Sequence, residues 1–190
     1  MARRGNPQGK GLTPVLDQWR AAQPALIRRR NARQVIADYF TTLLVLSADF
    51  SFKPAPGVPY HLYLRGEAWE LSLISPEEWR GRAPGPCLGR CELQNDMTWQ
   101  LAPRGDIEEH PALAKALDAF HEGFLALLAR EGALEDNLPH YIQHLPYYRR
   151  LLAAGMASSL KQSLALSGLS QRPGSDWLES ARTPGLARPD

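Results

Sequence analysis

The chain has 190 residues, of which 44% are hydrophobic and 22% are charged, and its formal net charge is +2. This length fits one domain of ordinary size, and the nearly balanced charge excludes a protein devoted to wrapping nucleic acid. The sequence has neither a run of about 18 apolar residues nor an apolar secretory leader. We therefore expect no membrane-spanning segment and a cytoplasmic location.

The N-terminal third is expected to be helical after a disordered basic arm at residues 1–12. Thr13 and Pro14 are typical of a helix start, and apolar residues spaced by three and four predict a second helix over residues 25–46. The helical region as a whole covers residues 13–47. Four arginines lie in the first turns of the second helix: Arg28, Arg29, Arg30 and Arg33.

The middle segment, residues 50–104, changes to the aromatic and alternating pattern of β-strands. The predicted strands cover residues 60–64, 68–74, 87–93 and 97–101. Arg65-Gly66-Glu67 supplies a hairpin turn between the first two strands. These features predict an α+β fold, with a small four-stranded antiparallel sheet packed against N-terminal and C-terminal helices.

Between the second and third strands, Ser75, Pro76 and Glu78 have the spacing of a capping box, with serine as N-cap and glutamate three residues later. This spacing predicts one helical turn. Trp79 is then placed to fold back on the sheet. We assign these residues and Trp99 structural roles, with the exposed faces of Trp79 and Trp99 available to a partner.

The C-terminal part is predicted to be helical over residues 111–167, with one helix at 111–130 and another at 140–165 that contains Pro146. Together with the sheet it completes a single domain over residues 13–167. From residue 168 to residue 190, Ser, Gly, Pro and Arg dominate, so we expect a disordered tail.

Cys87 and Cys91 are the two cysteines of the chain. Four residues apart on one strand, they would point to the same face about 13 Å from each other, which is too far for a disulfide. We expect two reduced thiols that fill apolar space.

Several blocks of the middle segment follow one another in an order that resembles a known family. These blocks are Lys53-Pro54, Gly57, residues 60–63, residues 73–79, Leu88-Gly89 and residues 96–99. The chain is similar in them to an uncharacterised family of small bacterial proteins with a eukaryotic relative, the DUF2452 type. The resemblance supports the fold and implies no activity and no cofactor. The chain departs from it in the basic loop at residues 80–82, at Cys91 and in the C-terminal helices.

The best candidate for a metal site is the pair His140 and His144, because two histidines four residues apart share one face of a helix. His121, on the preceding helix, is a candidate third ligand. No glutamate lies between the paired histidines to act as a base. A metal-dependent hydrolase is therefore an alternative, and paired surface imidazoles are the reading that we favour.

A second alternative is binding of RNA, DNA or another anionic surface through the Arg28–Arg33 helix, together with Arg149 and Arg150. Arginines beside aromatic residues can hold phosphates while the rings stack on bases. The same arginines also fit a solvated helix face.

The sequence carries no nucleophile motif, cofactor fingerprint or phosphate-binding loop. The leading hypothesis is therefore a non-enzymatic module that binds a partner protein or associates with itself, without a cofactor.

Overall fold

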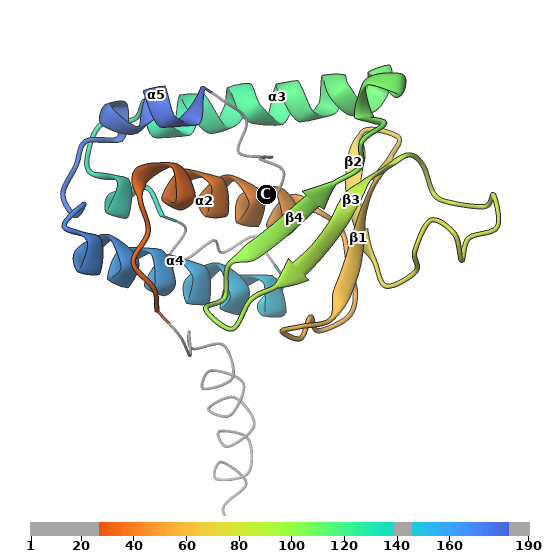
Figure 1. The fold of residues 1–190 in the computed structure, drawn as a ribbon, viewed down its shortest axis with the longest axis horizontal. Coiled ribbons are helices and arrows are strands. Elements are labelled where there is room, and N and C mark those ends of the chain that lie inside the picture. The colour runs from red at the N-terminus through yellow and green to blue at the C-terminus, as the bar shows by residue number, and fades with distance from the viewer. Residues whose placement is uncertain (1–26, 139–145, 183–190) are drawn as a thin grey trace, which may run out of the picture.

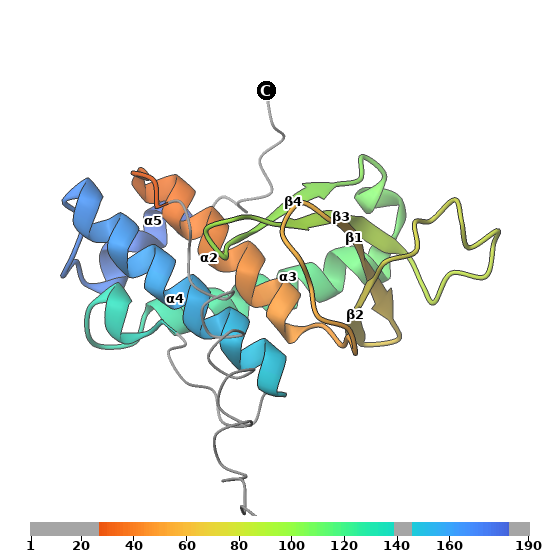
Figure 2. The same ribbon diagram turned by 90° about the horizontal axis from the view of Figure 1, so that it is seen from below.

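Helix α2, Ala32–Ser47, runs between two other helices, α3 (Pro111–Leu128) and α4 (Tyr147–Ser167). In this computed structural model, which describes residues 27–138 and 146–182, the sheet lies against one end of the helices (Figure 1). The view from below shows α4 running beside α2 (Figure 2). Because α2 has neighbours on several sides, most of its side chains are buried, including Val35, Tyr39 and Leu44.

The start of α2 differs from the prediction, because residues 27–31 have no regular secondary structure and the helix begins at Ala32. Asn31 is the N-cap: its side chain accepts a hydrogen bond from the Gln34 N–H at 2.9 Å. The Gln34 side chain in turn accepts one from the Asn31 N–H at 3.0 Å. This capping box fixes the N-terminal end of the helix at Asn31. The prediction of a helix that carries Arg28, Arg29 and Arg30 is therefore wrong.

The sheet is antiparallel throughout and has the strand order β2-β1-β3-β4, so the predicted α+β fold class is confirmed. Its strands are β1 (Pro59–Arg65), β2 (Ala68–Ser72), β3 (Cys87–Leu93) and β4 (Trp99–Pro103). A tight turn with Gly66 at φ +63° joins β1 to β2. Strand β2 ends two residues earlier than predicted and leaves Leu73 and Ile74 exposed.

A β-bulge separates the two cysteines onto opposite faces of β3. Tyr63 pairs with Cys87 while Leu62 pairs with Gly89, so one extra residue, Leu88, lies on β3 between them. The extra residue reverses the alternation of side chains. Cys91 consequently belongs to the main hydrophobic cluster, whereas Cys87 is buried on the other face of the sheet, and the expectation that both thiols point to one face is wrong.

The C-terminal half contains short 3₁₀ turns at Ile107–Glu109 and Leu134–Asp136 in addition to α3 and α4. Helix α4 begins at Tyr147, directly after Pro146, and residues 140–145 of the predicted helix lie outside the described residues. Proline lacks the N–H that a helix interior requires and disfavours a helical residue before it.

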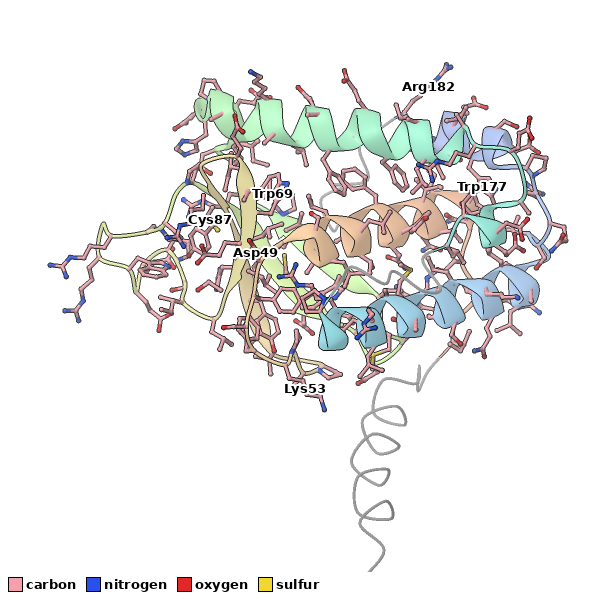
Figure 3. All side chains as sticks on the ribbon, turned by 180° about the vertical axis from the view of Figure 1, so that it is seen from behind. Asp49, Lys53, Trp69, Cys87, Trp177 and Arg182 are labelled. Atoms are coloured by element: carbon pink, nitrogen blue, oxygen red, sulfur yellow. The ribbon has the colours of Figure 1, made fainter. Side chains whose placement is uncertain are left out.

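Residues 168–182 differ from the disordered tail that the sequence predicts. They contain a 3₁₀ turn, Gly174–Trp177, and the short helix α5, Leu178–Ala181. Pro173 forms an isolated bridge with Ala133, and Trp177 is buried on the helical side of the molecule (Figure 3). Trp177 and Ala181 thus join this segment to the core.

Trp99 is fully buried at the start of β4, so the prediction that it offers an exposed aromatic surface is wrong. Its ring packs edge to face against Tyr60, and its backbone N–H donates to the Thr42 hydroxyl of α2 at 3.0 Å. These contacts join the sheet to the central helix. Within the part of the chain that the structure describes, no helix is long and apolar enough to cross a membrane.

Candidate functional site

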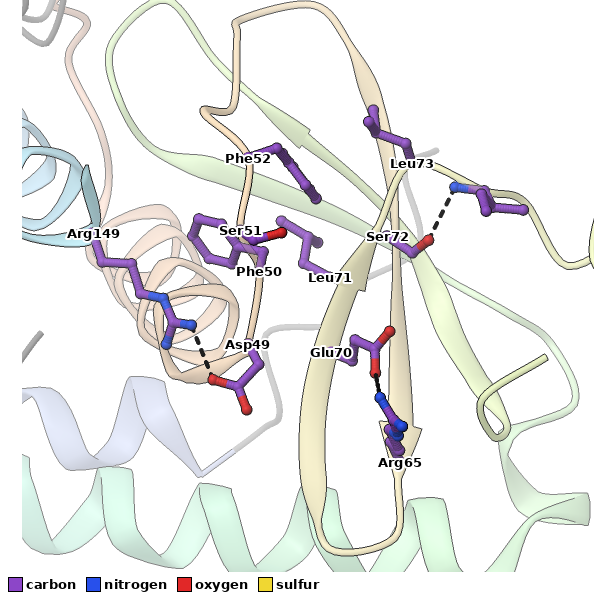
Figure 4. Close-up of a pocket in the computed structure, with 11 residues that line it drawn as sticks. Asp49, Phe50, Ser51, Phe52, Arg65, Glu70, Leu71, Ser72, Leu73 and Arg149 are labelled. Atoms are coloured by element: carbon purple, nitrogen blue, oxygen red, sulfur yellow. Dashed lines mark hydrogen bonds and ion pairs between the residues drawn. The ribbon is translucent and has the colours of Figure 1, made fainter. Parts of the chain in front are cut away.

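A groove of about 580 Å³ lies beside β2, the edge strand of the sheet (Figure 4). One wall is β2 with the two residues that follow it. The other wall is residues 49–52, which connect α2 to the sheet, and Arg149 of α4 reaches Asp49 from the side of this wall that faces away from β2. The residues of this β2 groove are Asp49, Phe50, Ser51, Phe52, Arg65, Glu70, Leu71, Ser72, Leu73, Ile74 and Arg149.

The two walls are hydrogen-bonded to each other at one point. The Asp49 N–H donates to the Trp69 carbonyl at 2.7 Å, and the Leu71 N–H donates to the Asp49 carbonyl at 3.0 Å. This is an isolated parallel bridge between Asp49 and Glu70. Beyond it the walls separate, and the groove is the space between them.

The edge of β2 continues past this bridge without a partner. The Trp69 carbonyl and the Leu71 N–H point away from β1, toward Asp49. Because every second residue of a strand directs its backbone groups to the same edge, the Leu71 carbonyl and the Leu73 N–H also point away from β1. Neither group has a hydrogen-bond partner among residues 27–138 and 146–182. The groove therefore presents one backbone acceptor and one backbone donor.

Apolar side chains line the open end of the β2 groove. Leu73 is 53% exposed and Ile74 is 40% exposed, so the two neighbouring side chains form a small apolar patch. Opposite them, Phe52 stacks on Tyr60 with ring centroids 5.3 Å apart and packs against Phe50. The aromatic wall is thus held in place by the sheet.

The charged side chains of the groove are paired with one another. Arg149 donates to Asp49 at 3.0 Å, and its guanidinium lies over the Phe50 ring, 4.7 Å from the centroid. Arg65 donates to Glu70 at 3.1 Å. Two acids and two arginines leave the groove without net charge.

A second polar cluster surrounds Arg30, whose side chain is fully buried. Its guanidinium donates to Asp38 of α2 at 2.6 Å, to Asp96 in the turn between β3 and β4, and more weakly to Thr98. Burial raises the pKa of Asp38, and the Arg30 guanidinium opposes that rise. Arg28 lies 3.5 Å from the Asp38 carboxylate.

Hydroxyl groups of α4 hold the backbone of the same segment. The Arg30 N–H donates to Ser167, and Ser163 donates to the Arg28 carbonyl at 2.6 Å. The cluster joins three parts of the chain that are distant in sequence, and it serves to hold residues 27–31 against the domain.

The arginines that the sequence singled out do not form one surface. Arg30 is buried, whereas Arg29 and Arg33 are exposed. Arg28 contacts the C-terminal half of α4 through Ser163, and Arg149 lies near its beginning, about 21 Å away along the helix. Arg150, beside Arg149, is half-buried. The structure therefore does not group them around one anion site.

The candidate metal ligands are only partly within the described residues. His121 is half-buried, its Nε2 lies 2.7 Å from the Ala181 carbonyl, and its ring packs edge to face against Phe40. His140 and His144 lie outside the described residues. Among residues 27–138 and 146–182, no three His, Cys, Asp or Glu side chains are placed to hold a metal ion.

The capping box after β2 has its expected hydrogen bonds. The Ser75 N–H donates to the Glu78 carboxylate at 2.8 Å, and the Glu78 N–H donates to the Ser75 hydroxyl at 3.4 Å. These bonds to Ser75 lower the pKa of Glu78. Residues 76–81 form turns and no regular helix, while Pro76 and Trp79 are half-buried, with Trp79 edge to face against Tyr63.

Sequence reasoning missed the β2 groove itself. The apolar run places Leu73 and Ile74 in the strand, and no sequence motif includes Asp49. Two signals are present in the sequence. The predicted strand at residues 68–74 is followed at once by the Ser75 cap, and residues 53–59 contain too many prolines to form a strand that pairs with it. Both favour a short edge strand.

These features define an α+β protein with a four-stranded antiparallel sheet and a groove at the open sheet edge. A model of a protein family described as a protein of unknown function, DUF2452, matches residues 9–122. The chain belongs to this family. The match includes both walls of the β2 groove, whereas Arg149 lies outside it. No solved structure matches the chain.

Proposed function

We propose that the protein is a non-enzymatic interaction module that binds an extended segment of a partner protein in the β2 groove. The single observation that carries this proposal is the unpaired backbone acceptor and donor, Leu71 and Leu73, at an open sheet edge. An extended peptide can add to such an edge as a further strand, with backbone hydrogen bonds supplying affinity.

The surroundings of the edge support a single added strand. The wall formed by residues 50–52 stands across the groove from β2, so it limits what can extend the sheet further. The exposed side chains of Leu73 and Ile74 supply apolar contact area for an occupant. A peptide strand satisfies the backbone groups and covers these side chains together.

We also infer a reducing, cytoplasmic location. Both cysteines are free thiols, and burial raises the pKa of Cys91, so that this group stays protonated and unreactive.

The proposal is tested by selecting peptides from a displayed library of random dodecapeptides against the full chain. Replacing Leu73 with lysine should weaken binding of the selected peptides about 10-fold or more, because it places a charge in the apolar end of the groove. Affinity is measured by isothermal titration, and the variant should keep the stability of the parent, since Leu73 is exposed.

Leu166 provides a matched control, because it is a leucine of α4 that is 48% exposed. Leu166→Lys should leave the affinity within about twofold of the parent value. A library that yields no binding peptide, or peptides that bind Leu73→Lys as well as the parent, would contradict the proposed function.

A further inference from the structure

We infer that the occupant of the β2 groove is an uncharged segment that runs parallel to β2 and has apolar side chains on both sides of the residue opposite Ser72. This inference rests on the proposed function. It names the direction and the chemistry of the partner segment that the groove accepts.

The direction is taken from the existing parallel bridge, because the free edge groups by themselves accept a strand of either direction. The Asp49 N–H donates to the Trp69 carbonyl, and the Asp49 carbonyl accepts from the Leu71 N–H. In a parallel pair of strands, one residue bonds in this way to the two residues that flank its partner, here Glu70. The next pair of groups along the edge, the Leu71 carbonyl and the Leu73 N–H, has the same order. One residue running parallel to β2 and placed opposite Ser72 satisfies both groups, and so repeats the geometry of Asp49 one step further along.

The absence of net charge follows from the ion pairs. Asp49 is bonded to Arg149, and Glu70 is bonded to Arg65, so the groove offers no excess charge that would attract an ionic ligand. Arg149 is also stacked over Phe50, which fixes its position. Binding is therefore expected to depend little on ionic strength, unlike binding to a basic surface.

The side-chain pattern follows from the two faces of β2. Glu70 and Ser72 pair with Tyr63 and His61 and share their face of the sheet, whereas Leu71 belongs to the core. A residue opposite Ser72 directs its side chain to the face of Glu70. Its two neighbours direct theirs to the face of Leu71, where apolar groups are favoured.

The peptides selected from the dodecapeptide library are the probes for this inference. Each is titrated against the full chain at about 50 mM and about 500 mM NaCl, and the dissociation constants should agree within about twofold. Each is then labelled with a nitroxide at one end and mixed with ¹⁵N-labelled protein. A label at the N-terminus should broaden the amide signal of Asp49, and a label at the C-terminus should broaden that of Ile74.

The outcomes separate the inference from the proposed function. Peptides that lose affinity on Leu73→Lys but weaken 10-fold or more with salt, or that broaden the two signals in the reverse order, overturn the inference and leave the proposed function standing. A library without any binder overturns both. Salt-insensitive peptides with the stated order of broadening support both.

Discussion

Replacing Arg30 with methionine is expected to lower the free energy of unfolding by about 3–5 kcal/mol. The Arg30 side chain is fully buried between Asp38 and Asp96, so its removal leaves two buried carboxylates without their common partner. Urea unfolding of the full chain measures the effect. Arg33→Met is the matched control: Arg33 is an exposed arginine of the first turn of α2, and its replacement should change stability by about 0.5 kcal/mol or less.

The stability deficit of Arg30→Met should also grow as the pH rises. Burial already raises the pKa of Asp38, and loss of the Arg30 guanidinium removes the attraction that opposes the rise. In the variant the folded state then holds the Asp38 proton more tightly than the unfolded state does, so stability falls as the pH increases above the ordinary carboxyl range. A deficit below about 1 kcal/mol at neutral pH, or one that shrinks with pH, would contradict the role assigned to Arg30.

Replacing Trp177 with alanine is expected to cost about 3–5 kcal/mol of unfolding free energy, as large-to-small changes in a core do. Trp177 is 1% exposed and belongs to the main hydrophobic cluster, although it follows a stretch rich in Ser, Gly and Pro. Ser175→Ala, at an exposed neighbouring position, should have little effect. Equal stability of the two variants would contradict the anchoring role assigned to Trp177.

The sheet could be predicted because its determinants are local. Alternating side chains and the Gly66 turn define β1 and β2, and the apolar spacing of residues 111–128 defines α3. The start of α2 could not be placed from spacing alone, since the apolar pattern continues upstream of Asn31. Its position depends on the capping box with Gln34 and on the ion pair between Arg30 and Asp96, which is 66 residues away in sequence.

The candidate site could not be predicted for a related reason. The β2 groove exists because Asp49 pairs with the edge of β2 that faces away from β1. This contact joins two segments that are separate in sequence, and no repeating pattern of apolar residues predicts it. Leu73 has the composition of a buried strand residue, and only the lack of a neighbouring strand leaves it exposed. Likewise, the arginines looked alike in the sequence, but burial separates Arg30 from Arg29.

Hydrogen exchange at two amides of β2 tests the proposed edge binding most directly. The Leu71 N–H, which donates to Asp49, should exchange slowly in the free protein, whereas the unpaired Leu73 N–H should exchange quickly. Addition of a selected peptide should slow exchange of the Leu73 N–H about 10-fold or more. An unchanged Leu73 rate at a saturating concentration of a bound peptide would contradict strand addition at this edge.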